Sequence, residues 1–175
     1  MQGICQKSCF GFWFLVILLG ATLAWAAAGE PVNFKQLLPL VKANLPGWEM
    51  DGEPRGATMK NPGIMFSEAE AGYKQGEKHF TIKIMDSPQA AMGFMGLSYA
   101  QGMEMESTEE SIKGTKINGM PAVETYRPPV KEAKIDVLAA NRFLVTVEGQ
   151  GFESIHELKN LLVHFELGKL AELAN

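Results

Sequence analysis

Much of this chain alternates between apolar and polar residues, and a period of two restricts a sequence to folds built on half-buried β-strands. In the clearest run, Phe80, Ile82 and Ile84 alternate with polar neighbours. Runs of this kind cover 65–74, 79–84, 111–117, 120–127, 131–138 and 143–148. Because short connections join neighbouring runs, the sequence predicts hairpins, and therefore a mainly antiparallel sheet of about six strands.

The connections contain residues that favour tight turns. Asn118-Gly119 separates two of the runs, and this pair is the strongest short hairpin signal because both central positions of a type I′ turn need a positive φ angle. Residues 139–141 are expected to turn the chain again. The stretch "EMDGEPRGATMKNPG" at 49–63 is dense in turn formers, and we expect a loop there with room for one short strand.

Three segments have the apolar period and the flanking residues of helices. The first covers 33–45, where Asn33 is a candidate N-cap and Pro39 is expected to shorten or kink the helix. The second covers 87–102 and begins with Ser-Pro, a favourable start. The third covers 154–165 and begins with "SIHE", the pattern of a capping box.

The predicted element order is α-ββ-α-ββββ-α. We therefore predict an α+β fold, a two-layer sandwich whose mainly antiparallel sheet carries its helices on one face. Residues 29–175 suit a single domain, since a chain of this length can bury a sizeable core.

The first 28 residues have the pattern of a signal peptide. Lys7 gives a positive start, an uncharged apolar run follows at 10–23, and Ala24-Trp25-Ala26 or Ala26-Ala27-Ala28 offers a cleavage site. We expect residues 1–28 to be cleaved and the protein to be periplasmic or secreted. The alternative is an inner-membrane anchor formed by residues 9–28, which are enough to cross a bilayer as a helix.

Both cysteines, Cys5 and Cys9, precede the apolar run, so the mature part contains no thiol. Disulfides, thiol catalysis and cysteine-based zinc sites are therefore excluded for that part. The whole chain has a net charge of −4, which loss of Lys7 makes one unit more negative. Because no basic stripe is present, nucleic acid is not an expected partner.

Three short segments resemble catalytic motifs, but each lacks a residue that the chemistry needs. "HELKN" at 156–160 has Asn160 where a zinc-binding helix places its second histidine. "VEGQGFES" has Ser154 in place of the third glycine of a dinucleotide-binding turn, and no further strand follows. "GLSYA" places Ser98 in a predicted helix, where a nucleophile elbow cannot form. We predict neither catalysis nor a cofactor.

The segment "AMGFMGLSYAQGMEM" at 91–105 has the most distinctive composition in the chain. Core packing explains most of it, because methionine fills irregular gaps. A helix that is apolar on every side cannot, however, hide its whole perimeter in a two-layer domain, and the remainder would form an adaptable docking patch. The residues expected to contact a partner or ligand are Met92, Phe94, Met95, Tyr99, Met103 and Tyr73.

The predicted function is accordingly that of an exported envelope protein of non-catalytic binding type, which docks a partner protein or an apolar ligand. One alternative is a periplasmic protein that handles Cu(I) or another soft metal, because thioethers are soft ligands; its candidate ligands are Met92, Met95, Met103 and Met105. A second alternative is a hydrolase whose carboxylates converge on a cleft; its candidates are Glu68, Glu70, Asp86 and Glu124.

Overall fold

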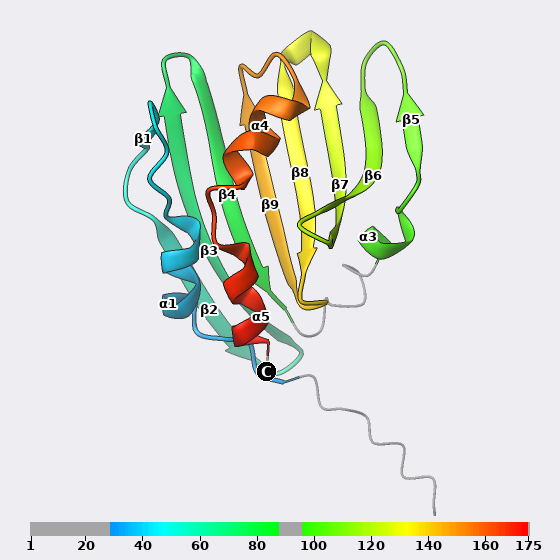
Figure 1. Cartoon of the computed structure of the whole chain (residues 1–175). Coiled ribbons are helices and arrows are strands. Elements are labelled where there is room, and N and C mark those ends of the chain that lie inside the picture. The colour runs from blue at the N-terminus through cyan, green and yellow to red at the C-terminus, as the bar shows by residue number, and fades with distance from the viewer. Residues whose placement is uncertain (1–28, 88–95, 175) are drawn as a thin grey trace, which may run out of the picture.

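Figure 1 shows the computed structural model of the chain, which describes residues 29–87 and 96–174. Nine strands within these residues form one sheet, in the order β1-β3-β4-β9-β8-β7-β6-β5, and β2 pairs with β3 beside β1. The strands are β1 (Glu49–Met50), β2 (Arg55–Asn61), β3 (Ile64–Gln75), β4 (Lys78–Asp86), β5 (Glu104–Glu106), β6 (Ser111–Ile117), β7 (Met120–Arg127), β8 (Glu132–Ala139) and β9 (Phe143–Gln150). Each pairing is antiparallel, as predicted.

The two tight turns expected in the second half are present. Asn118 and Gly119 join β6 to β7 with φ angles of 50° and 81°. Ala140 and Asn141 join β8 to β9 with φ angles of 50° and 52°. Two consecutive positive φ angles match the twist of the flanking strands, which is why such turns close hairpins.

The sheet has nine strands where about six were expected. The three additional strands are β1, β2 and β5. β1 and β2 lie in the stretch 49–63. Its many turn-forming residues predicted a loop, but the seven residues of β2 all pair with β3. β5 has three residues, all exposed, and so short a strand shows no measurable period.

The described helices are short. They are α1 (Phe34–Leu37), α3 (Gly96–Tyr99), α4 (Ile155–Leu162) and α5 (Leu170–Leu173), with 3-10 turns η1 (Leu38–Val41), η2 (Pro128–Val130) and η3 (Leu167–Lys169). Asn33 caps α1 as predicted, its side chain accepting a hydrogen bond from the Lys35 N–H at 3.0 Å. Pro39 lacks an N–H donor, so the helix expected over 33–45 continues only as η1. No helix in the described part is long and apolar enough to span a membrane.

The helix start predicted at Ser154 is confirmed, but the capping box expected there is not formed. The Glu157 carboxylate accepts a hydrogen bond at 3.2 Å from the N–H of Glu153, one residue before the N-cap, whereas the box requires the N–H of Ser154. The Ser154 side chain makes no capping hydrogen bond, and its backbone carbonyl accepts from the Glu157 N–H at 3.3 Å. Glu157 therefore stabilises the chain just before the helix in place of the N-cap itself.

The hydrophobic core lies on one face of the sheet, which we call the core face; the opposite one is the outer face. On the core face, alternate residues of β4, β9 and β8 are fully buried, among them Ile82, Val147 and Ile135. They form one cluster with η1, α4 and α5 (Figure 1). The aromatic rings of Trp48, Tyr73, Phe80, Phe152 and Phe165 pack together within this cluster at centroid distances of 5.0 to 6.4 Å.

The helices do not all lie on the core face. Gly114 of β6 pairs with Val123, which alternates with the buried core residue Ala122, so both point to the outer face. A Cβ on Gly114 would lie 1.6 Å from the Ala100 carbonyl oxygen, which places the end of α3 against the outer face. Leu138, 1% exposed, is buried on that same face, outside the main cluster. The expected single helical layer is therefore replaced by cover on both faces.

A buried ion pair fastens the start of the described chain to the sheet. Asp86, at the end of β4, is 0% exposed and accepts hydrogen bonds from Arg142 at 2.9 and 2.8 Å. The same carboxylate accepts a bond from the Val32 N–H at 2.7 Å, and Arg142 also donates to the Glu30 carbonyl at 2.9 Å. The chain that follows the apolar segment is thus held where β4 ends.

Candidate functional site

Two of the six predicted contact residues are exposed, and they are four residues apart in the chain. Tyr99, at the end of α3, is 84% exposed, and Met103, just before β5, is 47% exposed. Met105 in β5, which was considered as a metal ligand, is 45% exposed. Met92, Phe94 and Met95 lie outside the described residues.

Tyr73, the sixth predicted contact residue, belongs to the core. It is 2% exposed and stacks on Phe80 with ring centroids 5.0 Å apart. Its hydroxyl donates to the Val41 carbonyl at 2.9 Å and accepts from the Ala43 N–H at 2.8 Å. Burial raises the pKa of this hydroxyl, an effect that the bond from Ala43 opposes. Tyr73 holds η1 to the sheet and is not available to a partner.

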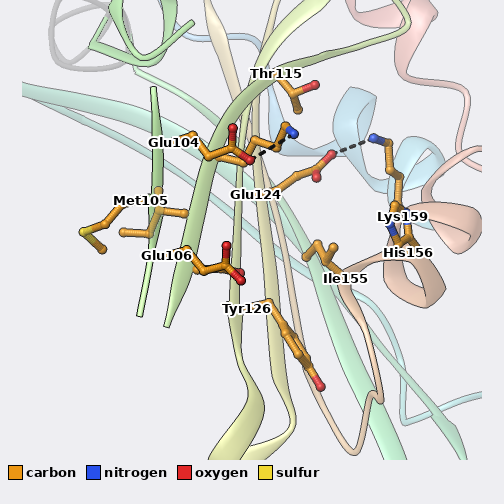
Figure 2. A pocket seen from close by; sticks show the side chains of 12 residues that line it. Glu104, Met105, Glu106, Thr115, Glu124, Tyr126, Ile155, His156 and Lys159 are labelled. Carbon is orange, nitrogen blue, oxygen red and sulfur yellow. Dashed lines mark hydrogen bonds and ion pairs between the residues drawn. The ribbon is translucent and has the colours of Figure 1, made fainter. Parts of the chain in front are cut away.

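Beyond α4, the core face is open and forms a groove. Helix α4 lies over β9 and β8 in Figure 1, whereas β6 and β5 extend past it. The groove has a volume of about 340 Å³ and lies between α4 and strands β5, β6 and β7. Its ionisable lining residues are Glu104, Glu106, Lys113, Glu124, Tyr126, His156 and Lys159 (Figure 2).

One side of the groove is fixed by a nearly buried ion pair. Glu124 of β7 is 7% exposed and lies on the core face, because it pairs across the sheet with the core residue Ile135. Lys159 of α4 donates to the Glu124 carboxylate at 2.7 Å. This bond, drawn in Figure 2, joins the helix to the sheet at the point where the core ends.

Tyr126 provides a second link between β7 and α4. Its hydroxyl lies 2.7 Å from the Glu153 carbonyl oxygen and 3.1 Å from that of Phe152, immediately before the helix. Burial, followed by the negative charge of Glu153, raises the pKa of this hydroxyl, which therefore stays protonated as a donor. The wall formed by α4 is thus held by two side chains of the same strand.

The other side of the groove is formed by the edge strand β5. Glu104 and Glu106 pair with Lys113 and Ser111 of β6, and their side chains point into the groove in Figure 2, where Met105 points away from it. Met105 lies on the outer face, and Met103 lies on that face too because its carbonyl accepts from the N–H of Gly114. β5 therefore separates an acidic side from an apolar side.

The four carboxylates considered for hydrolysis do not share a cleft. Glu68 and Glu70 lie on the outer face, where Lys83 and Arg55 pair with them at 2.8 and 2.6 Å. Asp86 is bound to Arg142 at one end of β4, and Glu124 lies on β7, with β9 and β8 between the two strands. Each carboxylate is held by its own cation, so the geometry gives the hydrolase hypothesis no support.

Histidines do not gather into a metal centre either. In the described part of the chain, no group of three His, Cys, Asp or Glu side chains is arranged to hold a metal ion. Of the four methionines considered for Cu(I), Met103 and Met105 share the outer face next to β5, and Met92 and Met95 lie outside the described residues.

Sequence reasoning missed the groove itself. The signal that was available is the stretch "EMESTEES" at 104–111, in which acidic residues alternate with an apolar one. Pairing of β5 with β6 turns that alternation into two chemically distinct faces. The opposite wall comes from α4, more than forty residues later in the chain, and no local pattern connects the two.

No protein-family model matches the sequence, and no curated protein matches it. Among solved structures, a crystal structure of an uncharacterised protein from Mycobacterium smegmatis aligns with 9% identity and a TM-score of 0.38, covering 74% of this chain and 90% of that chain. Nothing about function follows from a similarity of this degree.

Proposed function

We propose that this chain is an exported, non-catalytic binding domain that docks a partner protein of the cell envelope at the β5 end of its sheet. The observation that carries the proposal is the exposure of three large apolar side chains within seven residues: Tyr99, Met103 and Met105 are 84%, 47% and 45% exposed. Exposed apolar groups that are adjacent typify interaction surfaces, and methionine adapts readily to a partner.

Export is the first part of the proposal. Residues 1–28 act as a signal peptide, and the domain begins at Gly29, immediately before the bonds that Glu30 and Val32 make to the sheet. N-terminal sequencing of the protein from cell envelopes should give a start after Ala26 or Ala28. Recovery of the chain with residues 9–28 still attached would show instead an inner-membrane anchor.

The docking surface is tested by comparing the two ends of the sheet. Tyr99→Ser, Met103→Ser and Met105→Ser are combined in one variant. The matched control combines Met59→Ser with Ile64→Ser at the other end, where these side chains are 42% and 61% exposed. The wild type and the two variants are each isolated from native envelopes, and the proteins bound to them are quantified by mass spectrometry.

We expect a specific envelope protein to accompany the wild type and the control, and to be lost from the triple variant while its circular dichroism is unchanged. An identical set of proteins with all three forms would reject the docking surface. Recovery of a lipid in place of a protein would show that the patch serves an apolar ligand.

A copper-handling role is the second candidate, because Met103 and Met105 share one face. Titration with Cu(I) against a competing chelator separates the two functions. Binding tighter than micromolar that disappears in Met103→Ser/Met105→Ser would favour copper. Absence of such binding, with partner capture retained, would favour docking.

A further inference from the structure

Strand β5 is the last strand of the sheet in the described part of the chain, where no other strand pairs with its outward side. In an antiparallel ladder, residues that exchange hydrogen bonds alternate with residues whose N–H and C=O groups point the other way. The Gly114 N–H donates to the Met103 carbonyl at 2.8 Å, and the Ser107 N–H donates to the Glu110 carbonyl at 2.9 Å. Met105 lies between them in the same register, so the backbone groups of Glu104 and Glu106 point away from β6.

The side chains at this edge carry an uneven charge. Glu104 pairs with Lys113 at 3.3 Å, with both side chains more than half exposed, so the pair is weak. Among the described residues, none forms an ion pair with Glu106. Glu109 and Glu110 follow in the turn to β6, and only Glu110 is paired there, with Arg127 at 2.7 Å. The core-face side of β5 therefore carries two carboxylates, Glu104 in a weak ion pair and Glu106 in none among the described residues.

We propose that β5 accepts an extended segment of the partner protein as an additional strand, with basic residues opposite Glu104 and Glu106 and an apolar residue between them. This inference rests on the proposed function and specifies the kind of partner. The outward backbone groups of Glu104 and Glu106 supply the main-chain hydrogen bonds. Side chains directly opposite one another share a face, so the basic residues enter the acidic groove and the apolar one lies on Met105.

A second copy of this chain fits the edge less well. Antiparallel pairing of two β5 strands centred on Met105 would put Glu104 of one copy opposite Glu106 of the other, and like charges directly opposite are destabilising. Pairing with β2 of another copy offers a single cation on the core face, Lys60, which is already bonded to Glu30. A segment with two basic residues spaced by one apolar residue satisfies both glutamates.

The test uses synthetic peptides and the protein purified from the cells that make it. The probe is a fluorescein-labelled peptide of about eight alternating lysine and valine residues, a usual strand length. One control peptide has the same composition in two blocks, and another has glutamate in place of lysine. Fluorescence anisotropy measures binding, and amide exchange by NMR reports which backbone groups are covered.

We expect the alternating lysine peptide to bind at least roughly tenfold more tightly than either control peptide, and to slow exchange of the Glu104 and Glu106 amides. Glu104→Gln/Glu106→Gln should weaken binding by roughly tenfold, since two cross-strand charge pairs are lost. The control Glu49→Gln/Glu53→Gln changes exposed carboxylates at the other end of the sheet and should leave binding unchanged.

Three results would overturn the inference. The first is equal binding of the alternating and block peptides. The second is binding that leaves exchange at Glu104 and Glu106 unaltered. The third is self-association of the wild type, detected by sedimentation, that slows exchange of the Glu104 and Glu106 amides. If no peptide binds while the Tyr99, Met103 and Met105 variant still loses its envelope partner, strand addition is rejected and the docking function stands.

Discussion

The two ends of the sheet are built differently. At the β1–β2 end, α1 and η1 cover the core face, and the ring of Phe34 lies 2.7 Å from where a Cβ on Gly56 would be. At the β5 end, the core face opens into a groove, and the last strand has three residues, all exposed. Figure 1 shows the same contrast, with α1 in front of one end and no described helix in front of β5.

A single exposed residue does not identify a binding surface in this molecule. We call the β1–β2 end the closed end and the β5 end the open end. Met59 at the closed end and Met105 at the open end are almost equally exposed, at 42% and 45%. Met105 differs from Met59 in its surroundings: the exposed Met103 and Tyr99 lie within six residues of it, no described strand pairs with its outward edge, and a groove lies on the opposite face. Stability should therefore depend mainly on the closed end and the centre, and binding on the open end.

The largest loss of unfolding free energy is expected when the ion pair between Asp86 and Arg142, which holds the start of the described chain, is broken. Among the described residues, Arg142→Ala leaves the fully buried Asp86 carboxylate with the Val32 N–H as its one hydrogen-bond donor, and removing one member of a buried pair costs about 3 kcal/mol or more. Urea unfolding followed by tryptophan fluorescence measures the loss. Arg55→Ala is the control, because its side chain is 81% exposed and its pair with Glu70 should contribute less than about 1 kcal/mol. Equal losses would contradict the buried role of Asp86.

The next largest loss of stability is expected at one of two glycines that have no room for a side chain. A Cβ on Gly149, in the core, would lie 2.6 Å from Phe80 and from the His79 carbonyl, so Gly149→Ala should lower the unfolding free energy by about 1 to 3 kcal/mol. In Gly114→Ala, the nearest atoms to the new Cβ would be backbone atoms of Ala100 and Gln101, next to α3. We expect it to displace the chain at 96–103 and to speed amide exchange there. A global loss as large as that of Gly149→Ala would show that the open end supports the whole fold.

Elements whose residues record their own conformation could be predicted from the sequence. The strand that contains Gly149 follows from the alternation of Phe143, Val145 and Val147, because a half-buried strand leaves a local record of its two faces. The hairpin at Asn118-Gly119 was equally predictable, since its positive φ angles need particular residues. Local rules of this kind recovered the central strands and their antiparallel order.

The groove and the closed end follow from contacts between distant residues and could not be predicted. Tyr73 is of a residue type common in contact surfaces, but its hydroxyl bonds to the backbone of Val41 and Ala43, 32 and 30 residues earlier. The exposed edge at Glu104 becomes a wall of the groove because α4, which Lys159 and Tyr126 link to β7, lies opposite it. Neither fact leaves a periodic pattern in the sequence.

A smaller loss of stability is expected when the ion pair between Lys159 and Glu124 is removed from the groove. Lys159→Ala removes the ion-pair partner of Glu124, whose side chain is 8% exposed, and should lower the unfolding free energy by about 1 to 2 kcal/mol. Lys113→Ala removes the exposed pair with Glu104 and should change it by less than about 0.5 kcal/mol. Both are measured by urea unfolding. If Lys159→Ala/Glu124→Gln is no more stable than Lys159→Ala alone, the unpaired charge is not the cause of the loss.

The smallest effect concerns single amides at the open edge. Because Met105 bonds to β6 and its neighbours point outward, the amides of Glu104 and Glu106 should exchange almost as fast as in an unfolded peptide, and that of Met105 more slowly. In the centre of the sheet, the amides of β4 and β9 should exchange only with global unfolding, since strands flank them on both sides. Hydrogen exchange followed by NMR measures both. Equal protection at positions 104, 105 and 106 would mean that another part of the chain already covers this edge, and no partner strand could then be added there.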